Sequence, residues 1–127
     1  MQPTYAGFVI LRLNEIWGIW AEGDDVKALM LSLRFADTLM IRKIKKKLQH
    51  DVEVIREAMN KAGKTRAPNF YSTQMRRNRE LRIVARHYLG PFLSKLSDLL
   101  DEAGYYERTS TRLKSSDFKK LGDDSEA

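Results

Sequence analysis

The fold is decided by residues 25–63, DVKALMLSLRFADTLMIRKIKKKLQHDVEVIREAMNKAG, which contain no proline and no glycine before the last position. At about 100° of rotation per residue, ten apolar side chains of this stretch fall within about one third of a helix circumference. They belong to Val26, Met30, Leu33, Met40, Ile44, Leu48, Val52, Ile55, Met59 and Ala62. At about 1.5 Å per residue, the stretch predicts one continuous helix about 55 Å long.

A shorter helix is predicted at residues 5–21, where apolar side chains occupy most of the circumference. The stretch is too short to span a membrane, and Arg12 and Glu15 interrupt it. No basic leader precedes it, and no small-residue cleavage pattern follows it. We therefore expect a cytoplasmic, intracellular protein without membrane insertion.

A third helix is predicted at residues 72–103, with Gly104 as its stop. Gly90 and Pro91 lie inside this helix. Because proline lacks an amide donor and its ring crowds the preceding turn, the pair predicts either a kink or a break into two helices.

These helices predict an all-α fold, because no stretch alternates apolar and polar residues over the length of a strand. The two longer helices are joined by a short loop and should form a long antiparallel hairpin. The shorter N-terminal helix packs on one end of it, giving a three- to four-helix bundle. We expect residues 1–106 to form a single helical domain and residues 107–127 to form a polar, flexible tail.

The unequal helix lengths predict self-association. A helix of about 24 Å covers only one end of the hairpin, so an apolar stripe at the other end stays open. A second chain or the folded-back tail must cover it, and a second chain is favoured. The expected interface between copies consists of Ile44, Leu48, Val52, Ile55 and Met59.

The positive charge is concentrated in the middle of the chain. The net charge is +6, but residues 41–87 alone carry fourteen basic and four acidic residues, a net charge of +10. Most of these cations fall on the sides of the helices that face away from the apolar stripes. We take the following as candidate contacts to a phosphate backbone: Arg42, Lys43, Lys46, Lys47, Lys64, Arg66, Arg76, Arg79, Arg82 and Arg86.

This distribution favours a non-enzymatic protein that binds DNA or RNA independently of sequence, through two aligned rows of cations at one end of the hairpin. Phe70 and Tyr71 lie among basic residues of the connecting loop and could stack on unpaired bases. Two alternatives remain open. The cations could form an ordinary solvated surface, or the protein could be an oligomeric structural or adaptor bundle that binds other protein chains.

No pattern indicates catalysis, a metal, a cofactor or a small-molecule substrate. The chain has no cysteine, and its two histidines, His50 and His87, fall on different helices without metal-ligand spacing. Asp37 lies near the centre of the long stripe, where an unpaired carboxylate would be costly. We expect it to pair with Arg12 or Arg34, or to lie at the rim where the first helix departs.

Overall fold

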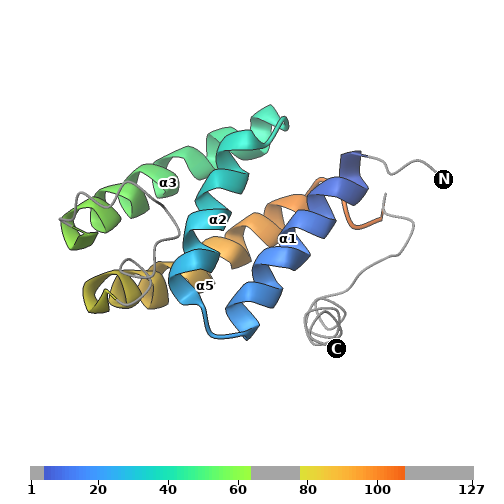
Figure 1. Ribbon diagram of the computed structural model, residues 1–127. Helices are drawn as coiled ribbons and strands as arrows, with labels where there is room; N and C mark the ends of the chain where they lie inside the picture. Colours follow the sequence, from blue (N-terminus) through green and yellow to red (C-terminus); the bar gives the residue numbers. More distant parts are fainter. Residues whose placement is uncertain (1–4, 64–77, 108–127) are drawn as a thin grey trace.

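The computed structural model describes residues 5–63 and 78–107 and contains four helices in that part of the chain (Figure 1). They are α1 (Tyr5–Ala21), α2 (Asp25–Thr38), α3 (Arg42–Gly63) and α5 (Arg79–Glu102). The described residues contain no strand. The predicted all-α bundle is confirmed.

The helices form two antiparallel hairpins that pack on each other (Figure 1). A short turn joins α1 to α2, with Gly23 at a φ of 93° and the Asp24 side chain accepting a hydrogen bond from the Lys27 N–H at 3.2 Å. The second hairpin pairs α3 with α5, and its register is marked by an ion pair of 2.5 Å between Asp51 and Lys95. Because α2 contacts α1, α3 and α5, it is the central helix of the bundle.

The prediction of one continuous helix over residues 25–63 is wrong. The chain leaves the helix at Leu39, which has extended backbone angles (φ −61°, ψ 127°), and α3 begins three residues later. The Met40 N–H donates a hydrogen bond of 2.9 Å to the Tyr5 hydroxyl, and the Lys45 N–H bonds the Ile41 carbonyl to close a new helical turn. Leu39 remains buried, so the break stays anchored in the core. Packing between helices outweighs the local preference for an unbroken helix.

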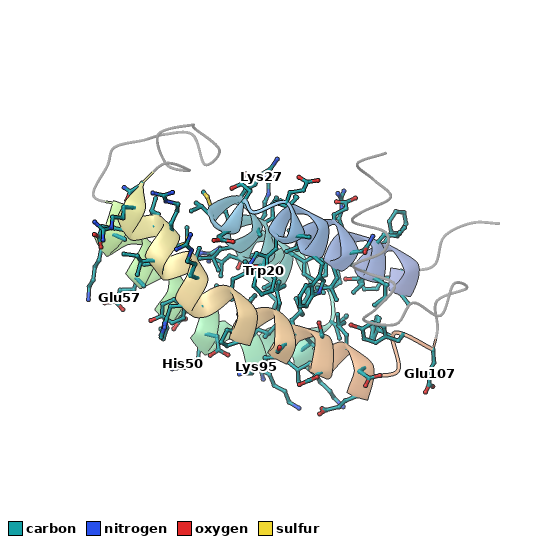
Figure 2. The ribbon with its side chains drawn as sticks, turned by 90° about the horizontal axis from the view of Figure 1, so that it is seen from below. Trp20, Lys27, His50, Glu57, Lys95 and Glu107 are labelled. Atoms are coloured by element: carbon teal, nitrogen blue, oxygen red, sulfur yellow. The ribbon has the colours of Figure 1, made fainter. Side chains whose placement is uncertain are left out.

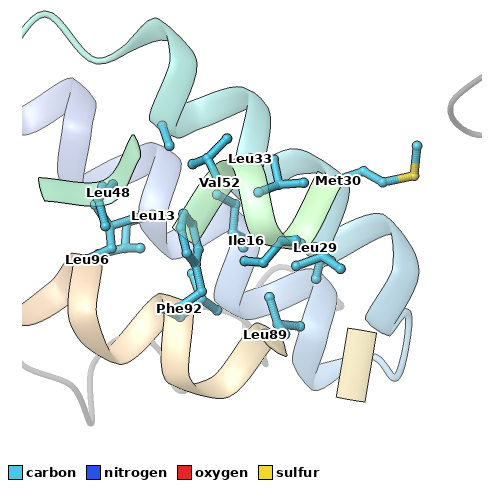
Figure 3. Close-up of a cluster of buried hydrophobic side chains, with 14 of the residues drawn as sticks. Leu13, Ile16, Leu29, Met30, Leu33, Leu48, Val52, Leu89, Phe92 and Leu96 are labelled. Atoms are coloured by element: carbon cyan, nitrogen blue, oxygen red, sulfur yellow. The ribbon is translucent and has the colours of Figure 1, made fainter. Parts of the chain in front are cut away.

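The break has a direct consequence for the expected interface between copies. Ile44, Leu48, Val52 and Ile55 are all buried within the single chain, and Met59 packs against the same core. The prediction that a second chain or the tail covers this stripe is therefore wrong, because α2 folds back over the α3–α5 pair and covers it. The core is a single cluster to which all four helices contribute (Figure 3).

The helix α5 runs through Gly90 and Pro91 without a break, so the alternative of two separate helices is excluded. It ends where the sequence predicted. Gly104 has a left-handed φ of 76°, and the Tyr105 N–H closes onto the Leu100 carbonyl at 3.0 Å. The beginning expected at residues 72–77 and the tail from residue 108 onward lie outside the described residues.

Candidate nucleic-acid interface

The strongest concentration of charge lies on the first two turns of α3. Five of its first six residues are exposed cations, and Ile44 is the one residue among the six that points into the core. We call this set the α3 cation cluster: Arg42, Lys43, Lys45, Lys46 and Lys47. Because Ile44 and Leu48 fix the buried side of the helix, the cations spread over its remaining circumference.

The electrostatics of the α3 cation cluster are unfavourable within the chain. The first turn of α3 contains no acidic residue, although the N-terminus of a helix favours negative charge. Arg42 with Lys46, and Lys43 with Lys47, are like-charged pairs four residues apart. No cation of the cluster forms an ion pair with a described residue. A bound polyanion would relieve this repulsion.

The acidic end of α5 lies alongside the start of α3, because the two helices are antiparallel (Figure 1). Asp98, Asp101 and Glu102 belong to this end. None of them forms an ion pair with a cluster cation in the described part of the chain. They reduce the positive potential on the α5 side of the cluster, and the outward side of α3 keeps its full charge.

A second group of cations lies at the opposite end of the α3–α5 pair. Lys61, Arg79, Arg82 and Arg86 surround the end at which Leu81 packs against Gly63. Lys61 pairs with Glu57 at 3.4 Å, and Arg86 pairs with Asp25 at 3.3 Å. Arg79 and Arg82 form no ion pair with a described residue.

The prediction of two aligned rows of cations is therefore wrong. Lys61 lies at the same end of the helix pair as Arg79 and Arg82. Lys43 and Lys61 are separated by eighteen residues of α3, or about 27 Å at about 1.5 Å per residue, so the α3 cation cluster is far from Arg79 and Arg82. The physical reason is the antiparallel register, which places the start of α3 far from the start of α5. The loop candidates Lys64, Arg66, Phe70, Tyr71 and Arg76 lie outside the described residues.

The Asp37 carboxylate pairs with the Arg56 guanidinium of α3 and is exposed. The prediction that Asp37 pairs with Arg12 or Arg34 is therefore wrong, because the break at Leu39 brings α3 beside the end of α2. The carboxylate lies at the rim of the bundle, which was the other position that we expected from the sequence.

A shallow groove that the sequence did not predict opens between α1 and α2. Its volume is about 380 Å³, and its lining combines apolar and charged side chains. These are Arg12, Glu15, Ile16, Leu31, Arg34, Phe35 and Thr38. Arg12 already pairs with Glu15 at 2.9 Å, and no pair of groups in the lining is arranged as an acid and a base.

The histidines lie on the other hairpin, and Figure 2 shows His50 on the side of the molecule opposite to Lys27. The part of the chain that the structure describes contains no group of three or more His, Asp or Glu side chains able to hold a metal ion.

Tyr106 packs against the core beyond the end of α5. Burial, together with the nearby Asp101 and Asp98 carboxylates, raises the pKa of its hydroxyl.

No protein-family model, curated protein sequence or solved structure matches this chain. Within residues 5–63 and 78–107, no helix combines the length and the apolar character needed to cross a membrane.

Proposed function

We propose that this protein binds the phosphate backbone of nucleic acids, independently of sequence, through the α3 cation cluster. The observation that carries the proposal is the presence of five exposed cations in the first six residues of a helix, with no ion pair to a described residue. Cations already engaged in ion pairs must give up those partners before they bind phosphate. The cluster has none to give up among the described residues, whereas Lys61 and Arg86 of the second group are already paired, so the cluster is favoured over that group.

The dimensions of the cluster suit a few adjacent phosphates. Residues 42–47 extend over about 8 Å of the helix axis, which is about the axial length of two to three nucleotides in a duplex strand. Neutralising phosphates releases condensed counterions, so binding should be strongest at low salt. Four of the five cations are lysines, which act as point charges and impose little geometry on the partner. We therefore expect the weak affinity typical of non-specific binding, with a Kd of about 1–100 µM at physiological salt.

The test compares two triple variants that remove the same charge from opposite ends of the α3–α5 pair. The first replaces Lys43, Lys46 and Lys47 by Gln, and the matched control replaces Lys61, Arg79 and Arg82 by Gln. Binding to a random-sequence DNA duplex and to single-stranded RNA is measured by fluorescence anisotropy from 25 to 200 mM salt. For the duplex, the first variant should lose about 0.9 from the log–log salt slope for each phosphate contact removed.

The control variant should keep most of the wild-type affinity and slope. Equal losses in the two variants would show that only the net charge matters, which contradicts a site on α3. If the wild-type protein shows no binding at 25 mM salt, the proposal is wrong and the structural or adaptor function is favoured. Circular dichroism should show unchanged helicity in both variants, because all six replaced side chains are exposed.

A further inference from the structure

The outward side of α1 carries a row of side chains, most of which are exposed. Phe8, Leu11, Arg12, Glu15 and Ile19 follow one another at intervals of three, one, three and four residues, which places them on one face of a helix. We call this row the outer stripe of α1. Phe8 is 52% exposed and Leu11 is 50% exposed, and Ile19 is partly buried.

One side of α1 is already buried in the core, so large apolar side chains that are exposed on its other side are unusual. Val9, Leu13 and Ile16 face inward and belong to the core. A helix that is apolar on nearly all sides is typical of one covered all round, yet α1 lies at the edge of the bundle (Figure 1). The outer stripe therefore has the composition of an interface rather than of a solvated surface.

The apolar surface continues beyond α1 at the N-terminal end of the helix. Tyr5 is 41% exposed, and its hydroxyl accepts a hydrogen bond from the Met40 N–H in the turn between α2 and α3. The Met40 side chain is 82% exposed. Two chain segments thus hold large apolar groups in water at the same end of the molecule.

The charges of the outer stripe indicate which partner it fits. Arg12 and Glu15 lie side by side in the middle of the stripe, 2.9 Å apart and both exposed. A stripe with one charge of each sign is complementary to itself. When two copies of α1 lie antiparallel, Arg12 of each copy can face Glu15 of the other while it stays beside Glu15 of its own chain, and Phe8 then lies over Ile19 of the second copy.

We propose that the outer stripe of α1 is a twofold interface between two copies of this chain. Such an interface is isologous, so each copy contributes the same residues. The groove beside Arg12 and Glu15 provides space for larger side chains of the second copy. The inference does not depend on nucleic-acid binding, because no residue of the outer stripe belongs to the α3 cation cluster.

The first test measures the mass of the full-length protein by sedimentation equilibrium between 1 and 200 µM. The wild-type protein should form a dimer within this range. The double variant Phe8→Ser, Leu11→Ser should weaken the dimer at least tenfold. The matched control Val54→Ser, Ile83→Ser changes two comparably exposed apolar residues, 37% and 48% exposed, on the other hairpin, and it should dimerise like the wild type.

The second test exchanges the charges. Arg12→Glu leaves two carboxylates in the stripe, and Glu15→Arg leaves two guanidinium groups, so each variant alone should dimerise at least tenfold more weakly. An equimolar mixture should restore dimers, because opposite charges then face each other again. Such restoration is not expected if the C-terminal tail or an unrelated protein occupies the stripe.

Three results would overturn the proposal: a wild-type monomer at 200 µM, a Phe8 and Leu11 variant that dimerises normally, or a charge-exchanged mixture that stays monomeric. Thermal melts of each variant identify any loss of folding. If the serine variant fails to fold, the charge-exchange pair decides the question, because Arg12 and Glu15 are exposed and outside the core.

Discussion

At the scale of single residues, Tyr106 shows how the chain beyond α5 completes the core. Its ring packs against the buried cluster from the turn that follows Gly104. Burial favours the neutral phenol over the phenolate and outweighs the hydrogen bond with the Ser97 side chain, which lowers the pKa. The nearby Asp101 and Asp98 carboxylates act in the same direction as burial, so the pKa is raised. The ordinary pKa of tyrosine is about 10. The free energy of unfolding therefore depends on pH in the alkaline range through the ionisation of Tyr106.

The sign of this coupling gives a prediction. A pKa raised in the folded state means that the stabilisation is complete below about pH 10 and is lost as the pH rises through the folded pKa. The variant Tyr106→Phe cannot ionise at this position. Its unfolding temperature should therefore fall less than that of the wild type between pH 9 and pH 11, measured by circular dichroism. Parallel pH profiles for the two proteins would contradict the burial of the hydroxyl in solution.

At the scale of helices, the sequence predicted which residues are buried better than it predicted where helices end. Ile44, Leu48, Val52 and Ile55 were assigned to one apolar stripe, and all four are buried. Periodicity states which face of a helix is covered, but it does not say by which element. The element that covers these four residues is α2. The prediction of one continuous helix had placed α2 in line with α3.

The break at Leu39 could not be predicted because its local signals are weak. The positions from Thr38 to Ile41 contain neither glycine nor proline. The Thr38 hydroxyl bonds the Phe35 carbonyl at 3.0 Å, but threonine makes the same bond inside unbroken helices. The contacts at the break are non-local, such as the hydrogen bond that the Met40 N–H donates to the Tyr5 hydroxyl, thirty-five residues earlier in the chain. Contacts of this kind depend on the whole fold.

The candidate site was predicted in part. The exposure of the cations on α3 follows from their position opposite the apolar stripe, and it is confirmed. The predicted alignment of these cations with Arg79 and Arg82 is wrong, although the sequence already contained the information needed to avoid this error. In an antiparallel hairpin, residues near the connecting loop lie together, and the start of α3 is the part of that helix farthest from the loop.

The start of α5 gives the prediction at this scale. The Asn78 side chain accepts hydrogen bonds from the N–H groups of Glu80 and Leu81, at 2.9 and 3.2 Å. Because these donors have no partner within the helix, Asn78→Ala should lower the free energy of unfolding by about 1 kcal/mol in urea titrations. The control Asn60→Ala, at an exposed position inside α3, should change it by less than about 0.5 kcal/mol. Equal effects would show that Asn78 does not cap the helix.

At the scale of the whole molecule, the central position of α2 determines how the two hairpins cooperate. Each hairpin alone would leave one apolar side in water, and α2 supplies buried side chains to both. Leu29 and Leu33 of α2 belong to the same cluster as Leu13 of α1, Leu48 of α3 and Leu96 of α5 (Figure 3). The two hairpins should therefore unfold together, in one transition.

A core substitution in one hairpin, observed from the other, tests this cooperation. The only tryptophans, Trp17 and Trp20, both lie on α1, so their fluorescence reports the first hairpin, whereas circular dichroism reports all helices. The variant Leu48→Ala removes a fully buried side chain from α3 and should cost about 2–5 kcal/mol. In urea titrations both signals should shift to the same lower midpoint. The control Ile83→Ala, at a position 48% exposed, should shift neither by much.

The outcome that contradicts a shared core is a fluorescence midpoint that stays at the wild-type value while the circular dichroism midpoint falls. In that case α1 and α2 would remain folded after α3 and α5 had unfolded, and the packing of α2 on α5 would contribute little to stability. Repeating the titration at two protein concentrations tenfold apart separates dimer dissociation from unfolding, because a transition within one chain has the same midpoint at both. The core position of Leu48 then predicts a loss of stability that does not depend on protein concentration.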